Sequence, residues 1–172
     1  MVRWNGIPFI LKCGKFLNES KAEIRIQLKD TPASTRYFSN AEEIVRNELV
    51  IRVQPQEAIY MKLNMKKPGT FDLRSEIAEL DLTYATRFRN SRIPEAYESL
   101  ILDVVNGDHS SFVGKDELKE AWEIADSIIH NSSRTSPIPY LPGSRGPEEA
   151  DIMIQNVGQY LRPNREYFWP KL

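Results

Sequence analysis

The chain has 172 residues, of which 41% are hydrophobic and 27% charged, and its formal net charge is -1. This length fits one domain with a sizeable core, and the composition rules out a disordered chain. A net charge near zero gives no overall attraction to nucleic acid or to anionic membranes. An anion-binding site would therefore have to come from local clustering of basic residues.

The cysteine content and the hydropathy bear on the compartment. The single cysteine, Cys13, excludes an intramolecular disulfide and indicates a reducing environment. Because Lys12 and Lys15 stand nearby, Cys13 is either a reactive thiol or a small buried core residue. No apolar run reaches the length of a transmembrane helix, and residues 1–6 form no apolar signal core. We therefore expect a cytoplasmic protein.

The first part of the chain predicts extended structure with loops between. Residues 6–14 predict a short apolar strand, which a polar turn at 15–20 follows. Residues 22–28 alternate strictly between apolar and polar side chains, which is typical of a half-buried strand. The Thr-, Ser- and Pro-rich residues 30–40 predict an exposed loop, and 41–46 predict a brief helical turn.

The strongest pattern lies in residues 47–63, where two alternating segments flank Pro55 and predict two antiparallel strands. One face of this hairpin is aliphatic, and we expect helices to bury it. The other face carries groups that suit a phosphorylated ligand or a charged partner, namely Arg52, Gln54, Tyr60 and Lys62. The alternative is that this second face is the ordinary solvated side of a half-exposed sheet.

Later residues predict one more strand and then helices. After a Pro-Gly turn, residues 71–84 predict an extended segment with Asp81 and Thr83 on one face. Residues 85–91, which include Arg87 and Arg89, are expected to form a polar connection. Pro94 then occupies the first turn of a helix, which Asn-Gly ends at Gly107.

Two further helices are expected, at residues 116–129 and from Pro147 to about residue 157. The apolar stripes of the first two helices are expected to lie in the core. Strands followed by helices, with hairpin-length connections, predict an α+β fold in which an antiparallel sheet carries helices on one face. The expected single domain has strands at about 7–84, helices at about 94–157 and an aromatic tail at 159–172, which should dock on the sheet or on a ligand.

The residues alone offer no catalytic constellation. There is no Gly-x-Gly-x-x-Gly after a strand, no phosphate-loop signature and no His/Cys spacing that would hold a metal. His109 is expected in a loop and His130 at a helix end, so neither is expected to act as an acid or base. Cations do gather on, or at the ends of, neighbouring predicted strands, where they could bind phosphate: Lys12, Lys15, Lys21, Arg25, Arg52 and Lys62. Arg145 precedes a predicted helix N-terminus, which favours anions.

Several segments resemble glucose-6-phosphate dehydrogenase, in unchanged order and over nearly the whole chain. They include Trp-Asn-Gly-Ile-Pro-Phe-Ile-Leu-Lys-Cys-Gly-Lys at 4–15, Arg-Asn-Glu-Leu-Val-Ile-Arg-Val-Gln-Pro at 46–55 and Ser-Arg-Gly-Pro-Glu-Glu-Ala-Asp at 144–151. Shorter matches lie at 79–84, 94–103 and 169–172. The resemblance is to the C-terminal part of that enzyme only.

The resemblance implies an activity that this chain does not carry alone. The family oxidises glucose 6-phosphate with NADP+ to 6-phosphogluconolactone, the first step of the oxidative pentose phosphate pathway. Its Rossmann coenzyme domain and its active-site peptide, Asp-His-Tyr-Leu-Gly-Lys with the general-base His, lie upstream, and Asp108-His109 is not that peptide. The chain is therefore expected to supply about half of the β+α domain, to contain no catalytic residue and to be inactive by itself.

The family's binding residues carry over to particular positions. Lys15 is similar to the substrate-binding lysine after Cys-Gly, and Gln54 to a substrate-contacting glutamine. Ser20 stands where a basic substrate ligand is expected, beside Lys21. Ligands of a second, structural NADP+ map to Lys12, Lys21, Arg25, Arg52, Tyr60, Lys62, Asp81, Thr83, Arg145, Tyr160 and Trp169. The family's sheet also forms its subunit interface, so the resemblance implies a homo-oligomer.

Two alternatives belong to other functional classes. The first is a truncated, non-catalytic module that binds NADP+ or dimerises. The second is a basic and aromatic sheet that binds single-stranded nucleic acid. The net charge of -1, and the lack of an aromatic pair on adjacent central strands, argue against the second alternative.

Overall fold

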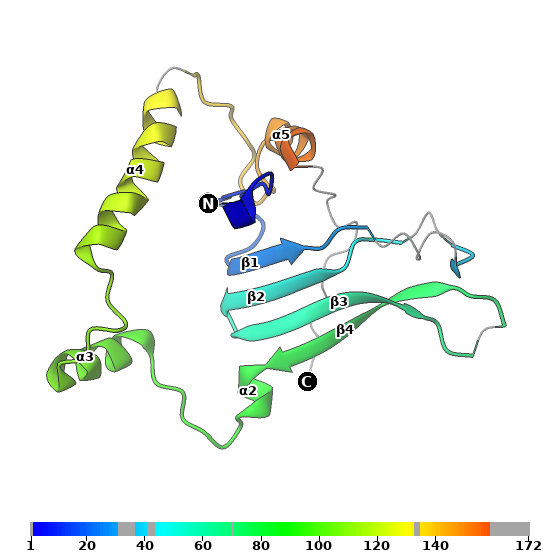
Figure 1. The fold of residues 1–172 in the computed structure, drawn as a ribbon, viewed down its shortest axis with the longest axis horizontal. Coiled ribbons are helices and arrows are strands. Elements are labelled where there is room, and N and C mark those ends of the chain that lie inside the picture. Colours follow the sequence, from blue (N-terminus) through cyan, green and yellow to red (C-terminus); the bar gives the residue numbers. More distant parts are fainter. Residues whose placement is uncertain (1, 31–36, 41–43, 70, 133–134, 159–172) are drawn as a thin grey trace. The chain divides into compact units, whose positions relative to one another are not determined.

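A computed structural model of the chain describes residues 2–30, 37–40, 44–69, 71–132 and 135–158. The chain divides into two compact units. The first consists of Met1–Arg89 and Tyr140–Leu172, and the second of Asn90–Pro139. The sheet and the residues predicted to bind phosphate on it belong to the first unit (Figure 1).

The first unit contains a four-stranded antiparallel sheet, in which each strand pairs with the next along the chain (Figure 1). Its strands are β1 (Ala22–Gln27), β2 (Glu48–Gln54), β3 (Ala58–Lys66) and β4 (Ser75–Thr83). The hairpin expected around Pro55 is confirmed, and so are the two outer strands. With the helices described below, this confirms the α+β class.

The register gives the sheet two faces of opposite character. We call one the polar face; three residues of each strand make it up, namely Glu23, Arg25 and Gln27, Glu48, Val50 and Arg52, Ala58, Tyr60 and Lys62, and Glu79, Asp81 and Thr83. We call the other the aliphatic face; it consists of Ile24, Ile26, Leu49, Ile51, Ile59, Met61, Leu80 and Leu82. The two faces follow from the alternation of side chains along a strand.

The polar face, rather than the aliphatic face, is the buried one. Tyr60 is 1% exposed and Lys62 7%, whereas Ile24 is 56% exposed and Leu80 59%. Within the described residues of the first unit, no helix buries the aliphatic face, which differs from the expectation. Charged groups can be buried on the other face because they pair with one another there. The burial of Glu48, Tyr60 and Lys62 argues against the alternative of an ordinary solvated face, although Glu79 and Asp81 on the outer strand are exposed.

The N-terminal segment differs from its prediction. A 3-10 turn, η1 (Val2–Trp4), is followed by residues that join no strand between positions 5 and 14. Apolar side chains there remain exposed, with Leu11 at 81%, so an apolar run alone did not make a strand. Cys13 is also exposed, which makes the buried-core alternative for this thiol wrong. Of the helical turn expected at 41–46, the described residues 44–46 are not helical.

The helices are α2 (Tyr84–Arg87), α3 (Ala96–Asn106), α4 (Lys115–Ser132) and α5 (Glu148–Gly158). The three helices predicted from sequence are confirmed as α3, α4 and α5, and α2 occupies part of the expected polar connection. None of these described helices is long and apolar enough to cross a membrane.

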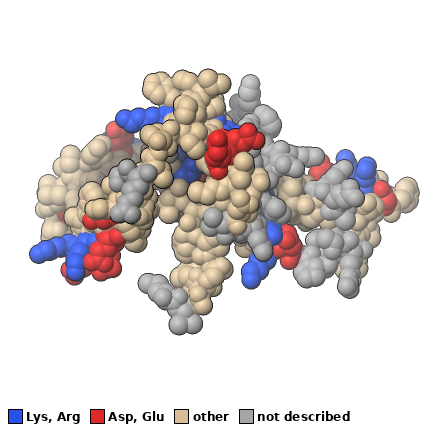
Figure 2. Space-filling view, turned by 90° about the horizontal axis from the view of Figure 1, so that it is seen from above, with Lys and Arg blue, Asp and Glu red and all other residues tan. Residues whose placement is uncertain are grey.

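The apolar stripes of α3 and α4 are exposed. Val105 is 77% exposed on α3 and Trp122 53% on α4, so the described residues of the second unit do not bury the stripes that were expected to be core. Figure 2 shows the charged side chains in small groups among larger stretches of uncharged ones. The expected docking of the aromatic tail concerns residues 159–172, which lie outside the described residues.

Candidate functional site

The sheet brings six of the predicted nucleotide-binding residues onto one face: Arg25, Arg52, Tyr60, Lys62, Asp81 and Thr83. Tyr60 is central, because it pairs with Val50 on one side and with Asp81 on the other. Lys62 is the partner of Glu79 on β4 in the same way. The local cause is the strict alternation of these strands, which directs every second side chain to this face. Whether these residues bind a ligand stays a prediction.

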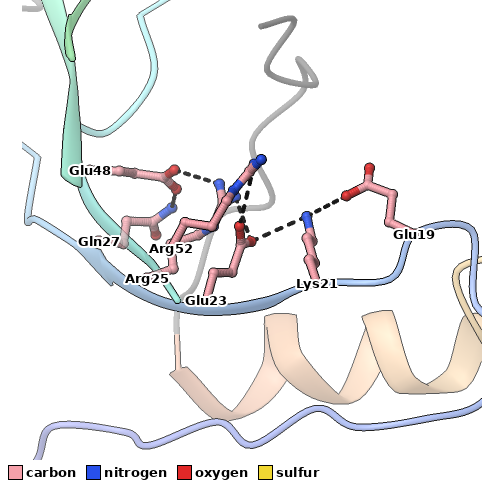
Figure 3. Close-up of polar contacts among 7 residues, drawn as sticks. All are labelled: Glu19, Lys21, Glu23, Arg25, Gln27, Glu48 and Arg52. Atoms are coloured by element: carbon pink, nitrogen blue, oxygen red, sulfur yellow. Dashed lines mark hydrogen bonds and ion pairs between the residues drawn. The ribbon is translucent and has the colours of Figure 1, made fainter. Parts of the chain in front are cut away.

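Arg25 is held in a fixed orientation by two carboxylates (Figure 3). Its Nη1 donates to Glu48 Oε2 at 2.8 Å, and its Nη2 donates to Glu23 Oε1 at 2.9 Å. Gln27 Nε2 donates to the other oxygen of Glu48 at 3.1 Å. Glu48 is 1% exposed, so this cluster fixes the guanidinium inside the face instead of leaving it in solvent.

Glu23 joins three cations of the site (Figure 3). Besides Arg25, its carboxylate lies 3.2 Å from Lys21 Nζ and 4.0 Å from Arg52 Nη2. Burial would raise the pKa of Glu23, but hydrogen bonds and charges from Arg25 and Lys21 outweigh it and leave the pKa below its usual value. Glu23 is thus ionised at neutral pH and links β1 to β2. Lys21 also contacts Glu19 at 2.8 Å.

The centre of the face carries two buried titratable groups. Burial is the main cause that raises the pKa of Tyr60, so its phenol stays neutral at physiological pH. Burial, followed by the charge of Arg25, lowers the pKa of Lys62, although Glu79, Glu48 and Glu23 favour its charged form. The ammonium of Lys62 is therefore partly desolvated, which strengthens its attraction for an anion.

The outer strand β4 contributes a different kind of group. Thr83 Oγ1 donates to Asp81 Oδ1 at 2.8 Å, so the two side chains are oriented together. A carboxylate beside a hydroxyl can accept hydrogen bonds from ribose hydroxyls or from an exocyclic amine. The polar face thus offers cations on β1 to β3 and acceptors on β4.

The remaining predicted nucleotide ligands that the structure describes lie outside the four strands. Lys12 is exposed in the N-terminal segment, and Arg145 is exposed just before α5. Lys21 is tied to the cluster through Glu23. Tyr160 and Trp169 lie outside the residues that the structure describes, so the predicted stacking on them stays a prediction.

The two predicted substrate residues lie in different settings. Lys15 is exposed in a loop, and its backbone carbonyl accepts a hydrogen bond from the Tyr140 hydroxyl at 2.7 Å. Gln54 is exposed at the end of β2, where it pairs with Ala22. Ser20, which stands where a basic ligand was expected, is exposed next to Lys21.

Sequence reasoning missed the two acids that organise the cations, Glu23 and Glu48. A signal was present in the sequence, because Glu23 and Arg25 are two residues apart and therefore lie on the same face of β1. The pairing of Arg25 with Glu48, by contrast, crosses to another strand and depends on the register. In the described segments no group of three or more His, Cys, Asp or Glu could hold a metal ion.

Comparison with known proteins decides the family. The family model described as "Glucose-6-phosphate dehydrogenase, C-terminal domain" matches residues 1–167. The chain belongs to the glucose-6-phosphate dehydrogenase family. Within this family it is similar to "Glucose-6-phosphate 1-dehydrogenase, cytoplasmic isoform" of Solanum tuberosum, with 51% identity over 169 residues that cover 97% of the chain. Glucose-6-phosphate 1-dehydrogenase of Bos indicus is 52% identical over 158 residues, or 91% of the chain.

A solved structure gives the same result for the fold. The chain is similar to a structure titled "Glucose-6-phosphate dehydrogenase in complex with its substrate glucose-6-phosphate", with a TM-score of 0.69 and 42% identity over 87% of the chain. The chain spans 30% of that structure and 32% of the Solanum tuberosum protein. The Solanum tuberosum and Bos indicus proteins are thus about three times as long as this chain.

Proposed function

We propose that the chain is the C-terminal part of an NADP-dependent glucose-6-phosphate dehydrogenase of the oxidative pentose phosphate pathway, working in the cytoplasm. In this proposal residues 1–172 belong to the β+α domain and contribute a structural NADP+ site, substrate contacts and a subunit interface. The observation that carries the proposal is the buried polar face, where Arg25, Arg52 and Lys62 lie within one sheet.

The polar face fits a dinucleotide with several phosphates. A guanidinium presents five N–H donors, so Arg25 can keep its two carboxylates and still donate to a phosphate oxygen. Lys62 supplies a partly desolvated point charge, and Asp81 with Thr83 supplies partners for a ribose or a base. A nucleotide bound there would contribute counter-charge and hydrogen bonds to the fold, and it would not take part in hydride transfer.

The substrate contacts proposed for this chain are Lys15 and Gln54. Lys15 would hold the phosphate of glucose 6-phosphate, with Lys21 close to the position where Ser20 replaces a basic ligand. The catalytic coenzyme site and the general base are proposed to lie outside these 172 residues, so the chain alone would not oxidise the sugar phosphate.

The subunit interface is proposed on the aliphatic face. Several isoleucine and leucine side chains there are exposed, for example Leu82 at 38% and Leu80 at 59%. A contiguous apolar sheet face of this kind is typical of protein–protein contacts. A second copy of the same sheet would bury it in a homodimer.

Calorimetric titration of the 172-residue chain with NADP+ and, separately, with NAD+ tests the nucleotide site. We expect NADP+ to bind more tightly, because its additional 2′-phosphate needs the cations of the polar face. Arg52→Ala should weaken NADP+ binding at least tenfold. The matched control Lys119→Ala removes an exposed cation of α4 and should change nothing. Equal weakening by both variants, or no binding by the wild type, would refute the site.

A second experiment tests the family role. An immunoblot against this segment in the source cells, followed by mass spectrometry of the band, gives the size of the native polypeptide. A species about three times as long as 172 residues, with peptides from a dinucleotide-binding domain, supports the dehydrogenase. A species of 172 residues would instead support a non-catalytic NADP+-binding or dimerisation module.

A further inference from the structure

The loop that carries Lys15 is bound by a segment that lies 125 positions further along the chain. The Tyr140 hydroxyl donates to the carbonyl of Lys15 at 2.7 Å. The next carbonyl, that of Phe16, accepts a hydrogen bond from the Gly143 amide, also at 2.7 Å. We call residues 140–144 the clamp, because they hold the two consecutive carbonyls that follow the Lys15 side chain.

The clamp continues beyond these two contacts. The Asn18 amide donates to the Ser144 carbonyl at 2.9 Å, and Leu17 forms a parallel bridge with Ser144. Within the loop, the Leu17 side chain packs so closely on Gly14 that a Cβ at position 14 would lie 3.1 Å from its Cδ1. The loop is therefore fixed by backbone hydrogen bonds to the clamp and by packing within the loop itself.

The conformation of this loop needs such support. Phe16 has a φ of 53°, in the left-handed region that residues other than glycine rarely adopt. Its ring is 79% exposed and contributes little to holding the backbone in this state. Residues in such regions persist when their surroundings over-determine them, and here the surroundings are the clamp. Without the clamp, the backbone at Lys15 and Phe16 would relax and the ammonium would occupy a wider volume.

We propose that Tyr140 is a positioning residue for Lys15 in the binding of the substrate phosphate. The inference rests on the proposed function, in which Lys15 holds glucose 6-phosphate. A lysine recognises phosphate as a point charge on a flexible stem, so its affinity depends on where the backbone places that stem. The Tyr140 hydroxyl fixes the carbonyl of Lys15 itself, which makes it the most direct point of control.

Steady-state kinetics of the native polypeptide that contains this sequence tests the inference, with Tyr140→Phe, Lys15→Ala and the double variant. Loss of one neutral hydrogen bond corresponds to a change of about threefold to tenfold. We expect Tyr140→Phe to raise KM for glucose 6-phosphate by that factor and to leave kcat within about twofold. In the Lys15→Ala background the same substitution should leave KM unchanged, because the residue that it positions is gone. The matched control is Tyr97→Phe, which removes an exposed hydroxyl from α3.

Amide hydrogen exchange gives a readout that does not depend on activity. Tyr140→Phe should speed exchange in a peptide that covers residues 16–18, and Tyr97→Phe should not. The inference is overturned if exchange is unchanged, if KM is unchanged while Lys15→Ala raises it, or if Tyr140→Phe raises KM equally in both backgrounds. A wild-type protein that does not oxidise glucose 6-phosphate would refute the proposed function and this inference together, and the wild-type assay alone identifies that case.

Discussion

The guanidinium of Arg25 reaches diagonally from β1 to the carboxylate of Glu48 on β2, with 2.8 Å between Nη1 and Oε2. The side chain of Glu48 is 2% exposed and that of Arg25 20%. The pair therefore lies inside the sheet unit, where an unpartnered charge is costly.

Glu48→Gln should destabilise the protein strongly, because it leaves the Arg25 charge buried without this counter-charge. Removing one partner of a buried ion pair costs about 3 kcal/mol. The matched control is Asp30→Asn, which breaks the exposed pair between Arg46 Nη2 and Asp30 Oδ2 at 2.7 Å and should cost less than about 1 kcal/mol. Urea unfolding of the three proteins measures both values, and equal losses would contradict the prediction.

Lys62→Met should change how stability depends on pH. Burial lowers the pKa of Lys62 below its usual 10.5, so the folded state holds this proton less tightly than the unfolded state does. Wild-type stability should therefore rise with pH between the lowered folded pKa and 10.5, by about 1.4 kcal/mol for each pH unit of that interval. The Lys62→Met variant should not show this rise in stability with pH.

Urea unfolding at several pH values between 7 and 10 measures the effect of Lys62. The raised pKa of Tyr60 lowers stability only as the pH approaches 10, where the unfolded phenol loses its proton, and both proteins contain Tyr60. Lys119→Met, on the exposed face of α4, is the control and should follow the wild type. A difference between wild type and Lys62→Met that stays constant with pH would show that Lys62 holds its proton normally.

Gly107→Ala should weaken the end of α3. Gly107 has a φ of 72° and a ψ of 18°, and its amide donates to the Val104 carbonyl at 3.2 Å as the helix stops. A side chain in this left-handed conformation costs about 1 kcal/mol. Gly114→Ala is the control, because its backbone lies outside that region and nothing lies within 4 Å of the added Cβ. Gly107→Ala should lower the midpoint of thermal unfolding, and Gly114→Ala should leave it unchanged.

Leu80→Lys should dissociate the proposed homodimer. The side chain is 59% exposed on the aliphatic face, and a charge there would be buried against the partner copy. We expect the dimer to weaken roughly tenfold or more, as judged by light scattering after gel filtration over a dilution series. Val104→Lys, at a site 63% exposed on α3, should leave the mass unchanged. A dimer that survives Leu80→Lys would place the interface elsewhere.

Local patterns predicted most of the secondary structure. The β2–β3 hairpin followed from its alternation around Pro55, and the end of α3 from Gly107. Pro94, expected in the first turn of α3, lies just before the N-cap Glu95. Such signals act within a few residues, so the sequence displays them directly. The same alternation placed Arg52, Tyr60 and Lys62 on one face.

Features that depend on distant partners could not be predicted in this way. Alternation defines two faces of a sheet but does not say which one is covered, and the polar face proved to be buried. The apolar residues 6–14 lacked a pairing strand within the described chain and so stayed outside the sheet. The contact of Tyr140 with Lys15 joins loops too far apart for any local pattern to reveal.

The strand order β1-β2-β3-β4 has a consequence for how the chain folds. Because β2, β3 and β4 are joined by short turns at residues 55–57 and 67–74, their pairing closes only small loops. β1 must close the longer loop of residues 28–47, which costs more chain entropy. We therefore expect the three-stranded meander to form first and β1 to join last. Because Arg25 and Glu23 are residues of β1, their ion pairs with Glu48 and Arg52 of β2 would form only at this final step.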